Sequence, residues 1–260
     1  MARVRIDKEL LRRGLVESRS EAAALIDDGR VRVNGAPVDK ASRQVTTGDS
    51  IQLTGQSRRF VSRGALKLEH ALNTFGIDVT GKTCIDVGAS TGGFTDCLLQ
   101  HGAAHVVAID VGRAQIHHRI LTDPRVQSIE RLHIRDASKQ LNGQTFQVVV
   151  ADLSFISLAS VAQYLSDLGD SAAQFVVLVK PQFEVGRDAV RSGRGVVTDH
   201  ELWQQSISSV IDAFVTAGRV HHGTIESPIQ GAEGNHEFLC WFGNGSTERL
   251  ESPVDEGPSS

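Results

Sequence analysis

The chain has 260 residues, 40% of them hydrophobic and 22% charged, which is enough for a medium-sized domain and a small one with buried cores. The net charge of −4 hides a division, because residues 1–63 contain thirteen Lys and Arg against eight Asp and Glu. This part therefore carries +5 and the remainder −9. A basic part joined to an acidic body indicates a polyanion-binding arm, although an ordinary solvated surface can give the same totals.

Membrane, secreted and metal-dependent classes are disfavoured. No apolar run approaches the ~18 residues that span a bilayer, and no secretory segment follows Met1, so we expect a cytoplasmic protein without a membrane partner. Three cysteines without a C-x-x-C pair favour buried free thiols over disulfides. The adjacent histidines at 117–118 and 221–222 point apart on any regular element, so we expect no metal.

Residues 1–55 are predicted to form a small α+β domain that begins with two helices. Apolar residues at helical spacing predict a helix over 6–17, with Gly14 closing it. A second helix is predicted over 21–28, and Gly29 ends it.

Short strands complete this domain. Charge alternates with Val over 30–33, as in a half-exposed strand. Asn34-Gly35 predicts a hairpin turn back into 36–38, and a later strand is expected over 50–53.

A polar linker over 56–62 is expected to lead into a second domain over 63–243, followed by a disordered tail over 244–260. A helix over 62–72 opens this domain. Strands and helices then alternate over 83–87, 94–101, 105–109, 112–121, 126–130, 147–151, 156–168, 174–179, 200–217, 220–225 and 236–242. This alternation predicts an α/β fold with a mostly parallel, seven-stranded sheet covered by helices on both faces.

The stretch Thr83–Thr95 is the centre of this domain, because a buried strand ends in glycines and restarts as a helix. Such a turn lets backbone N–H groups approach a ligand closely, although it can also be a plain turn. No Lys follows the glycines, so a nucleoside triphosphate is disfavoured. Asp110 ends the next apolar run, at the separation along the chain from the glycines at which an acidic residue commonly binds a ribose diol. An adenosine-bearing ligand without phosphates fits these facts, and S-adenosylmethionine is the obvious one.

Four charged residues occupy unusual places. Asp152 and Lys180 follow apolar strands, Glu237 stands inside the final strand, and Lys67 lies near the start of the first helix of this domain. A charge at the end of an apolar strand is costly unless it is partnered or useful. These four residues either compensate one another at one cleft or form unrelated ion pairs at the ends of the sheet.

The motifs resemble two known families. The first helices with "GRVRVNG" and "GDSIQL" look like an S4 domain, a small RNA-binding module. The motifs "DVGASTGGFT", "ADLSFIS" and "VKPQFE" resemble the TlyA family, once called haemolysins and now understood as ribosomal RNA 2′-O-methyltransferases. The resemblance covers about residues 3–243. It implies a Rossmann-like class I methyltransferase fold preceded by the S4 domain, and ribosomal RNA and ribosomal subunits as partners.

The resemblance also implies roles for individual residues. Lys67, Asp152, Lys180 and Glu237 match the Lys-Asp-Lys-Glu tetrad of ribose 2′-O-methyltransferases, with Lys180 as the base. The family acts on cytidine. For the cofactor S-adenosylmethionine, we expect contacts from Asp86, Gly88, Ala89, Ser90, Thr91, Gly92, Gly93, Asp110 and Asp136. Asp136 is placed to meet the adenine amino group, but it could equally be a helix N-cap.

RNA contacts are expected from arginines and a few aromatic residues. On the S4-like part the basic residues that match the family's RNA face are Arg12, Arg13, Arg19, Arg30 and Arg32, each of which could also be a plain surface charge. Three more arginines in the Gly-rich stretch 184–198 are predicted to grip phosphates, namely Arg187, Arg191 and Arg194. Phe155 and Phe183, beside Asp152 and Lys180, are the best candidates for stacking on a base; each is otherwise a core or rim residue.

Two other functions compete with the enzyme. A catalytically inactive RNA-binding or assembly factor could keep the same fold, although an intact tetrad and cofactor loop argue against it. A membrane-lytic haemolysin, as the old family name suggests, would need an apolar or amphipathic stretch that the sequence does not contain.

Overall fold

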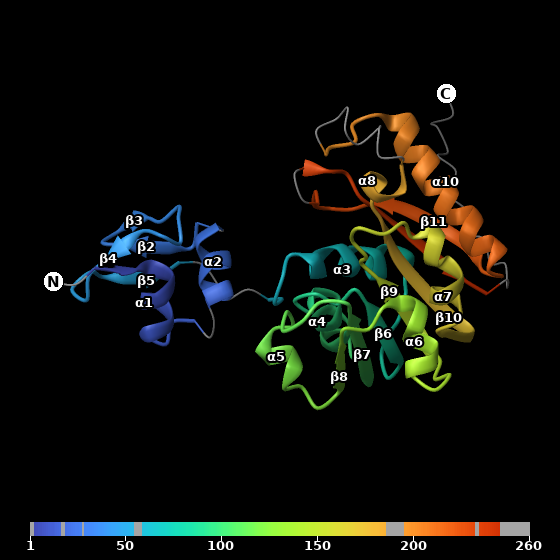
Figure 1. Cartoon of the computed structure of the whole chain (residues 1–260), viewed down its shortest axis with the longest axis horizontal. Coiled ribbons are helices and arrows are strands. Elements are labelled where there is room, and N and C mark those ends of the chain that lie inside the picture. The colour runs from blue at the N-terminus through green and yellow to red at the C-terminus, as the bar shows by residue number, and fades with distance from the viewer. Residues whose placement is uncertain are drawn as a thin grey trace, which may run out of the picture. The chain divides into compact units, whose positions relative to one another are not determined.

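The computed structural model describes residues 3–16, 19–27, 29–54, 59–185, 195–231 and 234–244. It divides the chain into two compact units, Met1–Arg59 and Phe60–Ser260, each of which is considered by itself (Figure 1). The tail beyond residue 244 and residues 56–58 of the expected linker lie outside the described residues, so the expectations about the tail and the linker stay predictions.

The N-terminal unit packs two helices against short strands. Its described elements are β1 (Val4–Arg5), α1 (Ile6–Arg12), α2 (Arg19–Asp27), β2 (Val31–Val33), β3 (Ala36–Pro37), β4 (Gln44–Val45) and β5 (Ile51–Leu53). β2 pairs antiparallel with both β3 and β5, and β1 pairs with β4. The Asn34-Gly35 turn is confirmed, because both residues have positive φ angles, 51° and 81°, as a tight two-residue hairpin requires.

The first helix is shorter than predicted, because it ends at Arg12. Gly14 adopts a left-handed φ of 66° just beyond this end, and Leu15 N donates to Leu10 O. The glycine therefore stops the helix, as expected, and Leu15 packs against the core from the loop. The strands β1 and β4 were not predicted, because two residues are too few to show a period.

The second unit is built on a seven-stranded sheet in the order β11-β12-β10-β9-β6-β7-β8. The five strands from β10 to β8 are parallel, and β12 and β11 join antiparallel at one edge, so the predicted mostly parallel sheet is confirmed. Its described elements are α3 (Gly64–Phe75), β6 (Thr83–Val87), α4 (Gly93–Gln100), β7 (His105–Asp110), α5 (His118–Leu121), β8 (Val126–Glu130), α6 (Ile134–Gln140), β9 (Phe146–Ala151), η1 (Ala159–Val161), α7 (Ala162–Ser166), β10 (Gly169–Val179), α8 (Pro181–Glu184), α10 (His200–Thr216), β11 (Val220–Glu226) and β12 (Phe238–Gly243).

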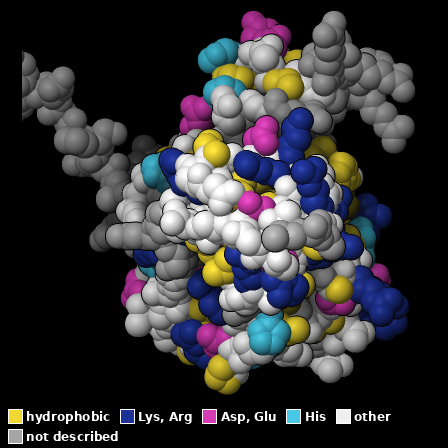
Figure 2. Space-filling view, turned by 90° about the vertical axis from the view of Figure 1, so that its left-hand side faces the viewer, with side chains coloured by type: hydrophobic (Ala, Val, Ile, Leu, Met, Phe, Trp, Pro, Cys, Tyr) yellow, Lys and Arg dark blue, Asp and Glu magenta, His cyan; other side chains and the backbone are white. Residues whose placement is uncertain are grey.

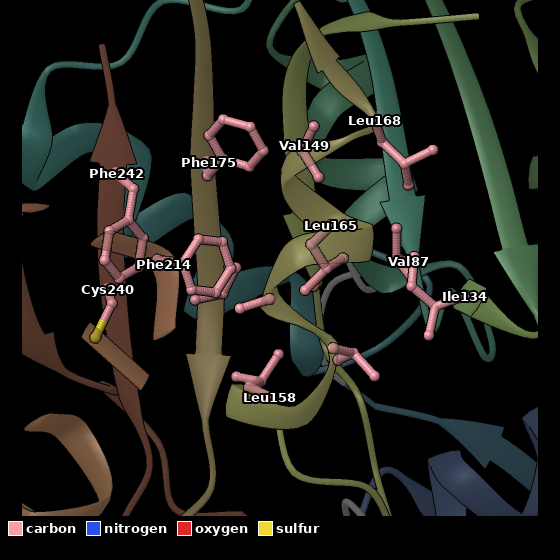
Figure 3. Packing of buried hydrophobic residues seen from close by; sticks show 14 of the residues in the cluster. Val87, Ile134, Val149, Leu158, Leu165, Leu168, Phe175, Phe214, Cys240 and Phe242 are labelled. Atoms are coloured by element: carbon pink, nitrogen blue, oxygen red, sulfur yellow. The ribbon is translucent and has the colours of Figure 1, made fainter. Parts of the chain in front are cut away.

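The sheet buries a separate hydrophobic cluster on each face. On one face, side chains such as Val149 and Phe175 meet α6, α7 and α10, and Phe214 of α10 stacks on Phe242 with ring centroids 4.4 Å apart (Figure 3). On the other face, Val150 and Leu178 meet α3 and α4. Because side chains alternate along a strand, this division fixes which residues beyond the strand ends share a face.

The predicted helix over 112–121 was wrong for its first half, because only His118–Leu121 is helical. Carboxylates of neighbouring strand ends capture the backbone there: Gly112 N donates to Asp110 Oδ1 at 2.6 Å, and Ala114 N to Glu130 Oε1 at 2.6 Å. The predicted helix over 156–168 is confined to η1 and α7.

The helix α6 was missed. Its N-cap is His133, an unusual capping residue, so the alternative interpretation of Asp136 as an N-cap was also wrong.

Candidate active site

The loop between β6 and α4 is shaped by glycines that a larger residue could not replace. Gly88 has a φ of 85°, and a Cβ atom there would lie 2.6 Å from the carbonyl oxygen of Asp152. The N–H groups of Gly88 and Ala89 both donate to Ile109 O. The loop is therefore held between the carboxyl ends of β7 and β9, and it leaves an open cradle above Gly88.

Two cavities open at this edge of the sheet, and they share Gly88, Ser90, Asp152 and Ser154. The larger has a volume of about 570 Å³, within the range of small-molecule sites, and extends toward Asp110, Leu132 and Ile134. The smaller, of about 240 Å³, is bordered by Ser62, Gly64, Thr91, Gly93, Phe94 and Lys180. An elongated ligand could lie across both.

Asp110 shapes the larger cavity. Its carboxylate accepts hydrogen bonds from Ser90 N at 2.8 Å and from Gly112 N at 2.6 Å, which fixes it at the end of β7. A carboxylate has about four acceptor sites, so these two bonds leave capacity for a ribose diol.

Not every residue predicted to contact the cofactor reaches the cavities. Gly88, Ala89, Ser90, Thr91, Gly93 and Asp110 line them. Gly92 is buried, and a Cβ atom there would lie 3.1 Å from Ile120 Cγ1, so it allows α4 to pack closely. Asp136 is exposed in the first turn of α6, where His133 and Ile134 are the residues that line the cavity.

Asp86 lies beneath the loop rather than on the wall of either cavity. It is 0% exposed, and its Oδ2 accepts from Thr95 Oγ1 at 2.6 Å and from Thr95 N at 2.9 Å, which ties β6 to the first turn of α4. Its Oδ1 has no hydrogen-bond partner among the described residues. Burial raises the pKa of Asp86 to about 7, and the charges of Asp152 and Asp110 add to the effect.

Asp86→Asn should remove a pH dependence of stability. The pKa of Asp86 rises from 3.8 to about 7 on folding, so the folded state keeps a proton that the unfolded state loses. This contribution to the free energy of unfolding is complete below about pH 4 and is lost as the pH rises through 7. Urea unfolding of both proteins should therefore show the wild type losing ~1 kcal/mol per pH unit relative to the variant over this window. Parallel pH profiles would contradict the assignment.

The four tetrad residues lie on one face of the sheet. Asp152, Lys180 and Glu237 each stand two positions from a residue of the cluster that packs against α3, namely Val150, Leu178 and Leu239. Val179 pairs with Phe238, so Lys180 just beyond β10 and Glu237 just before β12 are neighbours. The prediction that Glu237 stands inside the final strand was wrong, because β12 begins at Phe238. Lys67 projects from α3 on the same face and forms an ion pair with Glu237.

The tetrad consists of two buried or half-buried ion pairs. Lys180 Nζ lies 2.6 Å from Asp152 Oδ1 and donates to Ser154 Oγ at 2.9 Å. Lys180 and Lys67 are each 8% exposed and Glu237 is 2% exposed, whereas the Asp152 side chain retains 24% exposure. Lys180 and Asp152 line the smaller cavity, so one cation and one carboxylate face the space beside the glycine loop.

Sequence reasoning missed two residues that support this tetrad. Ser154 is the hydrogen-bond acceptor of Lys180, and its place two residues after Asp152 was the available signal. Gly231 packs on the carboxylate of Glu237, where an added Cβ would lie 2.1 Å from Oε1. The only sequence signal for Gly231 was a glycine in a turn, which does not distinguish it from others.

The two phenylalanines named as stacking candidates form a pair at the rim. Phe155 is 91% exposed with a φ of 66°, a left-handed conformation that is rare for a bulky residue. Its ring centroid lies 5.3 Å from that of Phe183, and Lys180 Nζ lies 5.9 Å from the Phe183 centroid. Backbone strain at an exposed aromatic residue beside a cavity indicates a functional role.

Two buried carboxylates of α1 organise arginines of the N-terminal unit. Glu9 lies 2.6 Å from Arg12 Nη2 and 2.8 Å from Arg13 Nε. The hydrogen bonds from these guanidiniums, with that of Arg12 the stronger, lower the pKa of Glu9 to about 2. Asp7 accepts from Arg5 at 3.0 Å and from Arg19 at 2.6 Å. Arg5 was not among the predicted RNA-binding arginines, because a pair of charged residues two positions apart is not a pattern that distinguishes it from other surface arginines.

The predicted RNA-binding arginines differ in exposure. Arg12, Arg19 and Arg32 are exposed, whereas Arg13 donates to Asp49 O and Arg30 donates to Thr54 O, which ties parts of the unit together. Figure 2, viewed from the side of this unit, shows Lys and Arg side chains spread over the face and interleaved with Asp and Glu. Arg187, Arg191 and Arg194 lie outside the described residues.

The described residues contain no helix long and apolar enough to cross a membrane, and no group of three or more His, Cys, Asp or Glu that could hold a metal ion. All three cysteines are free and buried, as predicted.

Known proteins resemble both units. An S4 domain model matches residues 4–51, and an FtsJ-like methyltransferase model matches residues 60–244. A Mycobacterium tuberculosis protein named 16S/23S rRNA (cytidine-2'-O)-methyltransferase TlyA is 43% identical over 98% of this chain and 99% of its own. Hemolysin A of Brachyspira hyodysenteriae is 40% identical over 92% and 99%. A solved Streptococcus thermophilus structure that carries a hemolysin name covers 98% of this chain and 93% of its own, with 36% identity and a TM-score of 0.73.

Proposed function

Since the chain belongs to the FtsJ-like methyltransferase family, in the TlyA group that adds an S4 domain, we propose that it transfers a methyl group from S-adenosylmethionine to a ribose 2′-hydroxyl of ribosomal RNA, with cytidine as the base. The family resemblance inferred from the sequence is thus confirmed. The observation that carries the proposal for this chain is the convergence of two Lys–carboxylate pairs beside a glycine-cradled cavity.

The residues present fit S-adenosylmethionine. Gly88 lines both cavities, so its backbone would approach the ligand, and Asp110 would accept hydrogen bonds from the ribose hydroxyls. The apolar side chains of Leu132 and Ile134 would cover the adenine. S-adenosylmethionine supplies a methyl group on a positively charged sulfur, which is a strong electrophile.

The chain itself has to orient the nucleophile and remove its proton. Alignment of two bound reactants alone can lower a barrier by about 7–11 kcal/mol. Lys180 Nζ lines the smaller cavity, so it would be the group nearest the 2′-hydroxyl and would receive its proton as the methyl group transfers. Asp152 would hold Lys180 in place, while Glu237 would hold Lys67, which could meet the substrate phosphate.

The N-terminal unit would deliver the RNA. The exposed guanidiniums of Arg12 and Arg19 are held by buried carboxylates, so little side-chain entropy is lost when they bind phosphates. We place the activity in the cytoplasm, on ribosomal subunits or their RNA.

Phe155→Ala should weaken RNA use far more than cofactor binding. An exposed aromatic ring at the cavity rim would stack on the target base, and such stacking contributes ~1–3 kcal/mol per base. We expect kcat/KM for RNA to fall by roughly 5–100-fold. Val215→Ala is the control, because Val215 is an apolar residue with 52% exposure that lines neither cavity. Equal effects of the two variants would contradict a stacking role.

Incubation with radiolabelled methyl donor, ribosomal subunits and naked RNA tests the function directly. A 2′-O-methyl group removes the hydroxyl that alkali needs for cleavage, so label in an alkali-resistant dinucleotide identifies ribose methylation. Cofactor binding without transfer to any RNA would instead favour an inactive assembly factor. Leakage of liposomes at micromolar protein would favour a lytic protein.

A further inference from the structure

Two segments that carry the site residues are tied together at a point outside the tetrad. One is residues 152–159, which leave β9 and carry Asp152 and Phe155. The other is residues 180–184, which leave β10 and carry Lys180 and Phe183. The tetrad pair Lys180–Asp152 and the ring pair Phe155–Phe183 join these segments on the side of the cavities.

Glu184, at the end of the second segment, joins the same two segments through hydrogen bonds to Ser157 and Leu158. Its Oε2 accepts from Ser157 Oγ at 2.6 Å, and its Oε1 accepts from Leu158 N at 2.7 Å. Leu158 is 2% exposed and belongs to the hydrophobic cluster under α7 and α10, so the captured backbone is anchored in the core. Sequence reasoning gave Glu184 no role.

A carboxylate suits this place because it only accepts hydrogen bonds. The hydroxyl of Ser157 and the N–H of Leu158 precede η1, whose first N–H groups have no partner within the helix. A glutamine would present one acceptor oxygen and one donor NH₂ group, so the Ser157 hydroxyl would have to turn from donor to acceptor, and the negative charge that strengthens both hydrogen bonds would be lost.

Through Ser157 and Leu158, Glu184 restrains the strained turn at Phe155. Phe155 stands two residues before Ser157 with a φ of 66°, and such a conformation persists only where the surroundings impose it. Exposure of 91% means that the Phe155 side chain itself contributes little packing to hold the turn. The residues that Glu184 holds, Ser157 and Leu158, follow this turn directly in the chain.

We propose that Glu184 is a positioning residue of methyl transfer, which locks residues 152–158 onto residues 180–184 so that Lys180, Asp152 and Phe155 meet the target nucleoside in fixed geometry. The inference rests on the proposed function for its substrate, but the restraint on the turn is independent of it. Glu184 acts through these three residues and touches neither reactant.

Glu184→Gln tests this proposal against Asp78→Asn. Asp78 also accepts a backbone N–H, from Thr80 at 2.9 Å, but it lies at the entry to β6, far along the strand from the cavities. The first readout is the rate of chymotrypsin cleavage after Phe155. Loss of the charge that strengthens these two hydrogen bonds should raise this rate by about tenfold in Glu184→Gln and not in Asp78→Asn.

The second readout is steady-state methyl transfer. Glu184→Gln should lower kcat and raise KM for RNA by about tenfold each, while the melting temperature changes little. In a Phe155→Ala background, the effect of Glu184→Gln on KM for RNA should shrink, because the residue through which it acts is already gone.

Unchanged cleavage in Glu184→Gln, or effects that multiply independently with Phe155→Ala, would overturn the proposal. A wild-type protein that transfers no methyl group would count against the proposed function instead. The cleavage comparison would still decide whether Glu184 holds the turn.

Discussion

Lys180→Ala should abolish methyl transfer to RNA and leave S-adenosylmethionine binding intact. Lys180 lines the smaller cavity, where its Nζ lies 2.6 Å from Asp152 Oδ1. It does not line the larger cavity around Asp110. Loss of a general base typically costs about 10²–10⁴-fold in rate. Single-turnover transfer and calorimetric titration of the cofactor measure the two effects separately.

The variant should still fold, because Lys180 and Asp152 both line the smaller cavity, so removing the lysine side chain lets water from the cavity reach the buried Oδ1 of Asp152. Lys82→Ala is a suitable control, since Lys82 precedes β6 at the opposite end of the sheet and is only partly buried. Transfer by Lys180→Ala at the wild-type rate would remove Lys180 from the mechanism. Loss of cofactor binding would show that it contacts the cofactor instead.

Gly88→Ala should weaken cofactor binding and, with it, activity. The new Cβ would stand 2.6 Å from the carbonyl oxygen of Asp152, which is backbone and cannot swing away, so the loop or the exit of β9 has to move. The cradle is also the place where the ligand would approach the backbone. We expect the affinity for S-adenosylmethionine to fall by at least ~10-fold, or about 1.4 kcal/mol.

Gly81→Ala separates this clash from the cost of a positive φ angle. Gly81 has a φ of 69° near the start of the same strand, but an added Cβ there meets nothing within 4 Å. Both variants should lose ~1 kcal/mol or more of stability, because alanine is strained in the left-handed region. Only Gly88→Ala should lose cofactor affinity. Equal binding by the two variants would mean that the loop does not hold the ligand.

The sequence determined the order and type of most elements in the second unit. Strands such as Thr83–Val87 and Val126–Glu130 were predicted to their terminal residues. Gly81 and Gly88 flank the first strand and Pro124 precedes the second, and such residues mark turns. The ending of the first helix by Gly14 and the hairpin turn at Asn34-Gly35 were also predicted correctly, since each requires a positive φ angle that few residues adopt. Motif order within the chain also identified the family.

Local patterns were insufficient wherever a distant group decided the conformation. The segment 112–117 has helical spacing, yet carboxylates from Asp110 and Glu130 capture its N–H groups and keep it irregular. Asp86 looked like a ligand contact from its place at a strand end, but the face of the sheet on which it lies buries it against Thr95. Neither outcome is encoded in the neighbouring residues alone.

For this chain, then, composition and periodicity determined the layers, and motif order determined the chemistry to expect. Only the three-dimensional fold decided which charges meet, because Lys67 and Glu237 are separated by 170 positions and become partners through the packing of α3 on the antiparallel edge of the sheet. Such a contact depends on strand register and helix placement together, and both follow from burying the two faces of one sheet at once.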